Sequence, residues 1–152
     1  AFDEAVQRAH VLDIEDATDR DELFRKAAAT LAGMPGCPEQ ERLAALLEER
    51  EAESSTAITP FAAVPHIVLE GDGVFELLRI RARKGIRFSE DAPSVKAVFI
   101  LAGTRDRRNL HLRALAAIAQ ALQSDRFETL WSRARAIEDL ADVLLLSQRP
   151  RG

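Results

Sequence analysis

The stretch VKAVFILA at residues 95–102 decides the fold class of this chain. It is an almost continuous apolar run, which is typical of a strand covered on both faces, so we expect it at the centre of a sheet. Upstream, Leu78, Ile80 and Ala82 alternate with basic residues, which indicates a half-buried strand, and residues 11–14 predict a short one. The basic residues are expected on the solvent face of the strands, and they are Arg79, Arg81, Arg83, Lys84 and Arg87.

Two helices are predicted between the first strand and the rest of the sheet. Thr18 or Asp19 can cap the first, whose apolar positions follow the helical period, and Gly33 provides a left-handed stop. Pro38 suits the first position of the second helix, which should end near Glu53.

A third long helix is expected after the central strand. Asp106 can cap it. Its inward face should carry Leu115, Ile118 and Leu122. Two further helical stretches are expected from about Asp125 and from about Ile137.

Helices before, between and after strands predict an α/β fold, in which a mixed β-sheet is sandwiched between helices. The chain has 152 residues, which suffice for one compact domain with a core. We expect this domain at residues 11–147, after a lead-in or linker at 1–10 and before a C-terminal tail at 148–152.

Composition excludes several classes of protein. The 21 basic and 25 acidic residues leave a formal charge of −4, which disfavours a domain built to hold nucleic acid. No apolar run approaches the roughly 18 residues of a bilayer crossing, so we expect no membrane insertion and a cytoplasmic location. One cysteine and three histidines exclude a thiol-rich zinc site, and phosphate-cradling glycine loops are missing. We expect neither metal nor cofactor.

Three residues stand out as chemical candidates. Arg50 falls on the apolar stripe of the second helix, where it either satisfies carbonyls at the helix end or clamps an anion. His66 follows Pro65 at an edge or strand end and is either a core histidine or a group that faces a partner. His111 begins the third helix among basic residues that oppose the helix dipole, and these either form a solvated loop or suit an anion. The basic residues are Arg105, Arg107, Arg108 and Arg113.

Several short strings together resemble one known family. They are LLEERE at 46–51, SST at 54–56, AVPH at 63–66, VFILA at 98–102 and HLRALAAIA at 111–119. In this order and spacing they resemble the type 2 IIA domain of the phosphoenolpyruvate-dependent sugar phosphotransferase system, the mannitol, fructose and nitrogen-regulatory class. The resemblance runs from about residue 11 to residue 145.

The resemblance implies roles for individual residues. His66, after the proline, would accept a phosphoryl group from the phosphocarrier protein HPr or its nitrogen-branch relative. His111 would be its companion histidine, and Arg50 the arginine before the Ser-Thr pair. Phosphate binding would then fall to Arg50, Ser55, Thr56 and His111. The rival hypothesis is a regulatory module that keeps the fold without phosphotransfer and binds an anion or a partner.

The sequence around His66 also resembles IIA-like domains appended to bacterial membrane transporters. Residues 58–62 lack the glycine turn that sugar and nitrogen-branch members usually carry, and the chain starts at Ala1 rather than methionine. We therefore expect the cytoplasmic regulatory tail of a transporter, and the free-standing nitrogen-regulatory type is the alternative.

This expectation makes a prediction about the reading frame that encodes the chain. Upstream of Ala1 it should encode hydrophobic spans of about 20 residues each. Sequencing that region tests the prediction, and a start codon immediately before Ala1 would refute it.

Overall fold

The computed structural model of the chain describes residues 10–134. One strand and two helices come first, four strands follow one another, and helical segments complete the described chain. Their bounds are β1 (His10–Ile14), α2 (Arg20–Ala32), α3 (Gln40–Glu53), β2 (Ala62–Ala63), β3 (His66–Leu69), β4 (Phe75–Ile86), β5 (Val95–Thr104), the 3-10 helix η1 (Arg105–Arg107), α4 (Arg108–Leu122) and α5 (Phe127–Arg133).

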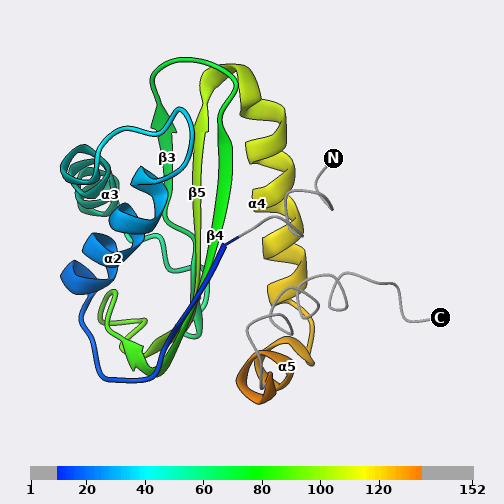
Figure 1. Cartoon of the computed structure of the whole chain (residues 1–152). Coiled ribbons are helices and arrows are strands. Elements are labelled where there is room, and N and C mark those ends of the chain that lie inside the picture. Colours follow the sequence, from blue (N-terminus) through cyan, green and yellow to red (C-terminus); the bar gives the residue numbers. More distant parts are fainter. Residues whose placement is uncertain (1–9, 135–152) are drawn as a thin grey trace.

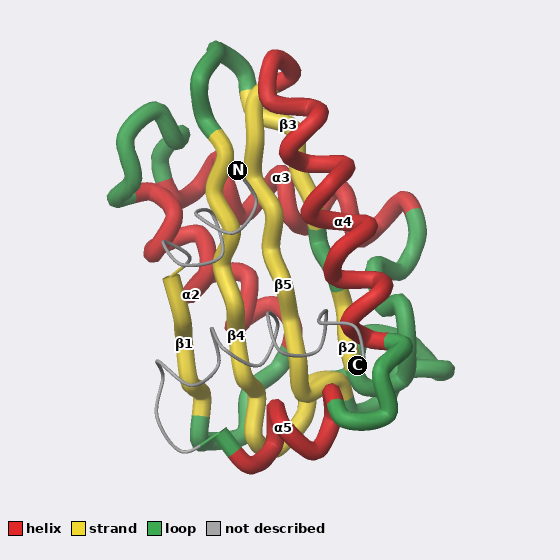
Figure 2. Tube along the Cα trace, turned by 90° about the vertical axis from the view of Figure 1, so that its right-hand side faces the viewer, coloured by secondary structure: helices red, strands yellow, loops and turns green. Residues whose placement is uncertain are grey.

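Strand β5 lies in the middle of a five-stranded mixed sheet, as its apolar sequence predicts. The order is β1-β4-β5-β2, and β3 also pairs with β5 (Figure 2). β4 runs antiparallel to β5, whereas β2 and β3 run parallel to it. Every residue of β5 except Lys96 is buried.

Helices cover both faces of the sheet, and the predicted sandwich is confirmed. α2 and α3 lie on one face, and α4 and α5 lie on the other (Figure 1). The alternation in β4 separates the two cores. Leu78 and Ile80 pack in the core beneath α2 and α3, and Leu77 packs in the core beneath α4 and α5.

The helix boundaries depart from the predictions in detail. Asp19 caps α2 as expected, since its carboxylate accepts from the amide of Glu22 at 2.8 Å. Gly33 follows α2 but is not left-handed, because its φ of −78° continues the helical region. Pro38 is not the first helical residue, because α3 begins at Gln40.

Asp106 does not cap the third helix. It lies in η1, and its carboxylate accepts from the hydroxyl of Thr104 and from the amide of Gly73, so it ties two loops together. α4 begins at Arg108 and buries Ala114, Ile118 and Ala121, with Leu115 and Leu122 packed beside them. α5 begins two residues after the predicted Asp125, and the stretch predicted from Ile137 lies outside the described residues.

The prediction of a solvent face for the basic residues of β4 is wrong for two of them. Arg79 and Arg81 are only 1% and 2% exposed, and they alternate with Leu78 and Ile80, which belong to the core beneath α2 and α3. They therefore point to the other face of the sheet, where Arg81 contacts Trp131 of α5. Arg83, Lys84 and Arg87, farther along the chain, are exposed as expected.

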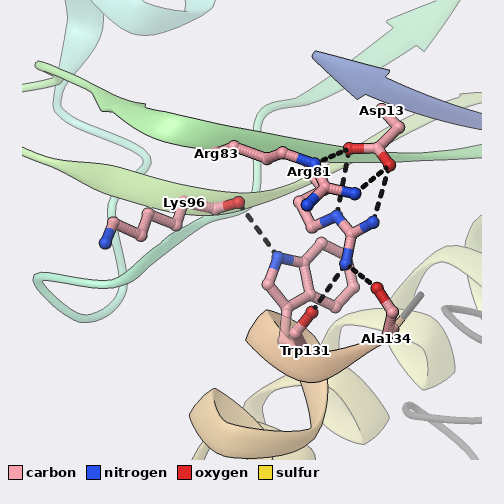
Figure 3. A network of polar contacts seen from close by, with 6 residues as sticks. All are labelled: Asp13, Arg81, Arg83, Lys96, Trp131 and Ala134. Carbon is pink, nitrogen blue, oxygen red and sulfur yellow. Dashed lines mark hydrogen bonds and ion pairs between the residues drawn. The ribbon is translucent and has the colours of Figure 1, made fainter. Parts of the chain in front are cut away.

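The carboxylate of Asp13 balances the charge of Arg81, and all three nitrogens of the guanidinium group donate hydrogen bonds (Figure 3). Its Nε and Nη2 donate to the carboxylate of Asp13 at 3.0 and 2.6 Å, and Nη1 donates to the carbonyls of Trp131, at 3.1 Å, and of Ala134. Arg83 binds the same carboxylate at 3.1 and 2.9 Å. The hydrogen bond from Arg81 is the largest of the effects that lower the pKa of Asp13 from 3.8 to about 2.

Removing this carboxylate should destabilise the fold. Asp13→Asn leaves a buried guanidinium without its counter-charge, and we expect the free energy of unfolding to fall by about 3 kcal/mol. Because the folded-state pKa is lowered, the carboxylate stabilises the wild type above pH 3.8, and this contribution is lost as the pH falls towards 2. Urea denaturation at several pH values measures both effects. Asp16→Asn, at an exposed position, is the control, and equal stabilities of the two variants would contradict the prediction.

Candidate functional site

A pocket of about 360 Å³ lies where β3, β5 and the start of α4 meet. β3 and β5 are parallel, with His66 opposite Leu101, so their carboxyl ends meet at one edge of the sheet. α4 follows β5 after a single turn and returns past this edge. The lining residues are His66, Val68, Gly103, Thr104, Arg105, Arg108, His111, Leu112 and Leu115.

The two candidate histidines meet in this pocket. Ile67 and Leu69 belong to the core beneath α2 and α3, so His66, which precedes Ile67 and alternates with both residues along β3, points to the side of α4. The rings of His66 and His111 lie edge to face, with centroids 5.5 Å apart and planes at 75°. The structure thus brings together residues that are 45 positions apart in the sequence.

The tautomer of His66 follows from its hydrogen bond. Nδ1 lies 2.9 Å from the carbonyl oxygen of Val64, which can only accept. Nδ1 therefore carries the proton and donates it, and in the neutral ring the lone pair belongs to Nε2. A neutral imidazole with a free Nε2 is a competent nucleophile near pH 7.

A chain of hydrogen bonds connects His66 to the end of α3. The buried carboxylate of Glu51 accepts from the amide and the hydroxyl of Thr56, at 2.8 and 2.6 Å. The carbonyl of Thr56 accepts from the amide of Val64 at 2.9 Å, and the carbonyl of Val64 accepts from His66. Glu51, Thr56 and Val64 thereby fix the position of the ring.

Arg50 and Ser55 lie outside the lining of the pocket. Nη1 of Arg50 donates to the carbonyl of Ser54 at 3.0 Å, beyond the end of α3. This is the contact that a purely structural role predicts. α3, which carries Arg50, covers the opposite face of the sheet from α4 (Figure 1). The hydroxyl of Ser55 accepts from the amide of Ala57 at 3.3 Å.

Sequence reasoning missed the apolar and small residues of the pocket. Val68 and Leu112 are about half exposed at its rim, and Gly103 lies at its floor. A Cβ atom at 103 would lie 3.3 Å from the ring of Phe75 and 3.9 Å from Nδ1 of His111. The signal for Val68 was its alternation with His66, whereas Gly103 became visible only from the pairing of β3 with β5.

The electrostatic setting of His111 favours its neutral form. Burial lowers the pKa of His111 below 6.5, and the nearby His66 and Arg108 lower it further. His111 is therefore available as a neutral hydrogen-bond donor beside His66 near pH 7.

The described part of the chain has neither a metal-binding cluster nor a helix fit to cross a membrane. Residues 10–134 contain no group of three or more histidine, cysteine or carboxylate side chains placed to hold a metal ion. None of their helices combines the length and apolar character of a bilayer crossing.

Comparison with known proteins gives one family and a consistent fold. The family model described as "Phosphoenolpyruvate-dependent sugar phosphotransferase system, EIIA 2" matches residues 5–146. No curated protein matches the chain.

Solved structures with the same fold include two regulatory or sugar-specific IIA proteins and one complex. The nitrogen regulatory protein IIA-Ntr from Neisseria meningitidis has a TM-score of 0.81 at 22% identity, over 93% of this chain and 97% of that one. IIA mannitol from Escherichia coli has a TM-score of 0.71 at 19% identity, over 89% and 95%. The Escherichia coli complex of enzyme IIA mannitol with phosphorylated enzyme IIB mannitol gives 0.72 at 18% identity, over 90% and 94%.

Proposed function

The chain belongs to the EIIA 2 family of the phosphoenolpyruvate-dependent sugar phosphotransferase system, a family of phosphocarrier and regulatory domains, and from this premise we propose that His66 carries the phosphoryl group. The observation that supports the proposal most strongly is the hydrogen bond from Nδ1 of His66 to Val64. It leaves Nε2 as the nucleophile in a pocket that also holds His111 and two arginines.

The transfer step is a displacement at phosphorus. The lone pair of Nε2 attacks the phosphorus of the donor, and an N–P bond forms while the bond from phosphorus to the donor's carrier atom breaks. The carrier atom leaves with the electron pair of that bond. The proton on Nδ1 stays in its hydrogen bond to Val64 throughout, so His66 needs no separate base.

The remaining predicted site residues receive supporting roles in this proposal. His111 donates a hydrogen bond to a transferred oxygen, for which its neighbouring position and neutral form suit it. Thr56 positions His66 through Val64 while its hydroxyl stays bound to Glu51. Arg50 and Ser55 flank this connection, and Arg50 assists phosphate binding from the open edge of β3.

The donor in this proposal is an HPr-type phosphocarrier protein. Val68 and Leu112 offer exposed apolar surface beside the pocket for such a protein to contact. A IIB-type domain, as in the mannitol complex, is the corresponding acceptor. We also propose a cytoplasmic location and the regulation of a transporter carried on the same polypeptide, on the strength of the sequence around His66.

His66 should be the one phosphoacceptor. Incubation with phosphoenolpyruvate, the first enzyme of the pathway and HPr should add one acid-labile phosphate to the intact protein. We expect His66→Ala to abolish this gain in mass, and His10→Ala, at an exposed position outside the pocket, to retain it. Labelling on serine would overturn the proposal. The absence of labelling with a donor verified on another IIA domain would favour the anion-binding module instead.

Arg50→Ala and His111→Ala should slow transfer without unfolding the domain. Both side chains are only half-buried, and the loss of one electrostatic donor costs about 2.7–4 kcal/mol of barrier, which is roughly a hundredfold to a thousandfold in rate. Quenched-flow measurement of phosphotransfer gives the rates, and circular dichroism reports the folded fraction. If Arg50→Ala unfolds the domain while the remaining folded fraction transfers the phosphoryl group at the normal rate, then the role of Arg50 is structural, through its contact with Ser54.

A further inference from the structure

The pocket around His66 carries more positive charge than the family motif predicts. Arg105, in η1, and Arg108, at the start of α4, both line it with the two histidines. Arg108 lies three residues before His111, so both side chains share one face of α4. Arg107, between the two arginines, does not line the pocket.

Neither pocket arginine is neutralised within the described chain. In residues 10–134 the guanidinium groups of Arg105 and Arg108 form no ion pair and no hydrogen bond. The nearest carboxylate in sequence, Asp106, is bound by Thr104 and Gly73, and its side chain also lies 3.8 Å from Nε of Arg107. Two guanidinium groups therefore remain free to bind a ligand at the pocket.

The charge of Arg108 reaches the site itself. It is one of the causes that lower the pKa of His111, after burial and the neighbouring His66. Guanidinium groups match a phosphoryl group especially well, because their planar fork can donate to two of its oxygens.

We propose that Arg108, with Arg105 beside it, binds the phosphoryl oxygens at His66. This inference rests on the proposed function, because the contact contributes to catalysis only if His66 accepts the phosphoryl group. It assigns a positive contact to the start of α4, inside the pocket, in addition to the contact proposed for Arg50. The anion is a phosphoryl dianion, or inorganic phosphate when the protein is unmodified.

Binding of inorganic phosphate to the unmodified protein tests the contact without any transfer. The imidazole NMR signals of His66 and His111 should shift in a saturable way with added phosphate. Arg108→Gln should weaken this binding about tenfold or more, and Arg105→Gln should weaken it less. Arg107→Gln is the matched control, because it removes the same charge one residue away from the pocket lining, and it should bind as the wild type does.

Transfer kinetics give the second measurement. With the full donor system, Arg108→Gln should slow phosphorylation of His66 about a hundredfold, whereas Arg107→Gln should stay within about twofold of the wild type. Arg108→Lys, which keeps the charge but loses the fork, should fall between them. Amide NMR spectra establish that each variant is folded.

The two proposals fail in different ways. If phosphate does not bind, or if Arg107→Gln weakens it as much as Arg108→Gln does, the inference is wrong. It is also wrong if His66 is phosphorylated at the full rate in both Arg108→Gln and Arg105→Gln, a result that leaves the proposed function standing. If phosphate binds through Arg108 but His66 accepts no phosphoryl group, the arginine contact stands and the proposed function falls.

Discussion

The hydrogen bond between Nδ1 of His66 and the carbonyl of Val64 is the contact on which the site depends. A carbonyl can only accept, so this bond selects one tautomer and orients the ring. Val64 is held in turn through Thr56 by the buried carboxylate of Glu51. The ring is therefore anchored to the end of α3, on the opposite face of the sheet, although its reactive edge points to α4.

The position of β5 makes the pocket possible. Because β5 pairs with β3 in parallel, His66 lies opposite Leu101, three residues before the end of β5, from which the chain continues into η1 and α4. One short turn, η1, then brings His111 back over the same edge. Asp106, which the sequence suggested as a helix cap, instead secures this turn to Gly73 in the loop before β4.

The sequence allowed the fold and the histidine pair to be predicted, but not the whole site. The apolar run at 95–102 and the alternation at 78–82 reflect local periodicity, which a single chain displays directly. Periodicity indicates which residues share one face of a strand, but it does not indicate whether other elements cover that face. For this reason Arg79 and Arg81 were expected to face solvent, although both are buried. The family motif likewise led to Arg50, which lies outside the pocket lining. The sequence did indicate that the basic residues around His111 suit an anion, but which of them line the pocket depends on tertiary packing.

The carbonyl of Val64 also bears on what happens after transfer. A phosphoryl group on Nε2, with the proton still on Nδ1, leaves the imidazole ring formally cationic. A neutral acceptor at Nδ1 favours retention of that proton. A cationic ring departs from phosphorus more readily than a neutral one, so the N–P bond stays labile. In the proposed transfer, the main-chain oxygen that prepares His66 to receive the group would thus also keep the group ready for onward delivery and limit how long the domain can store it.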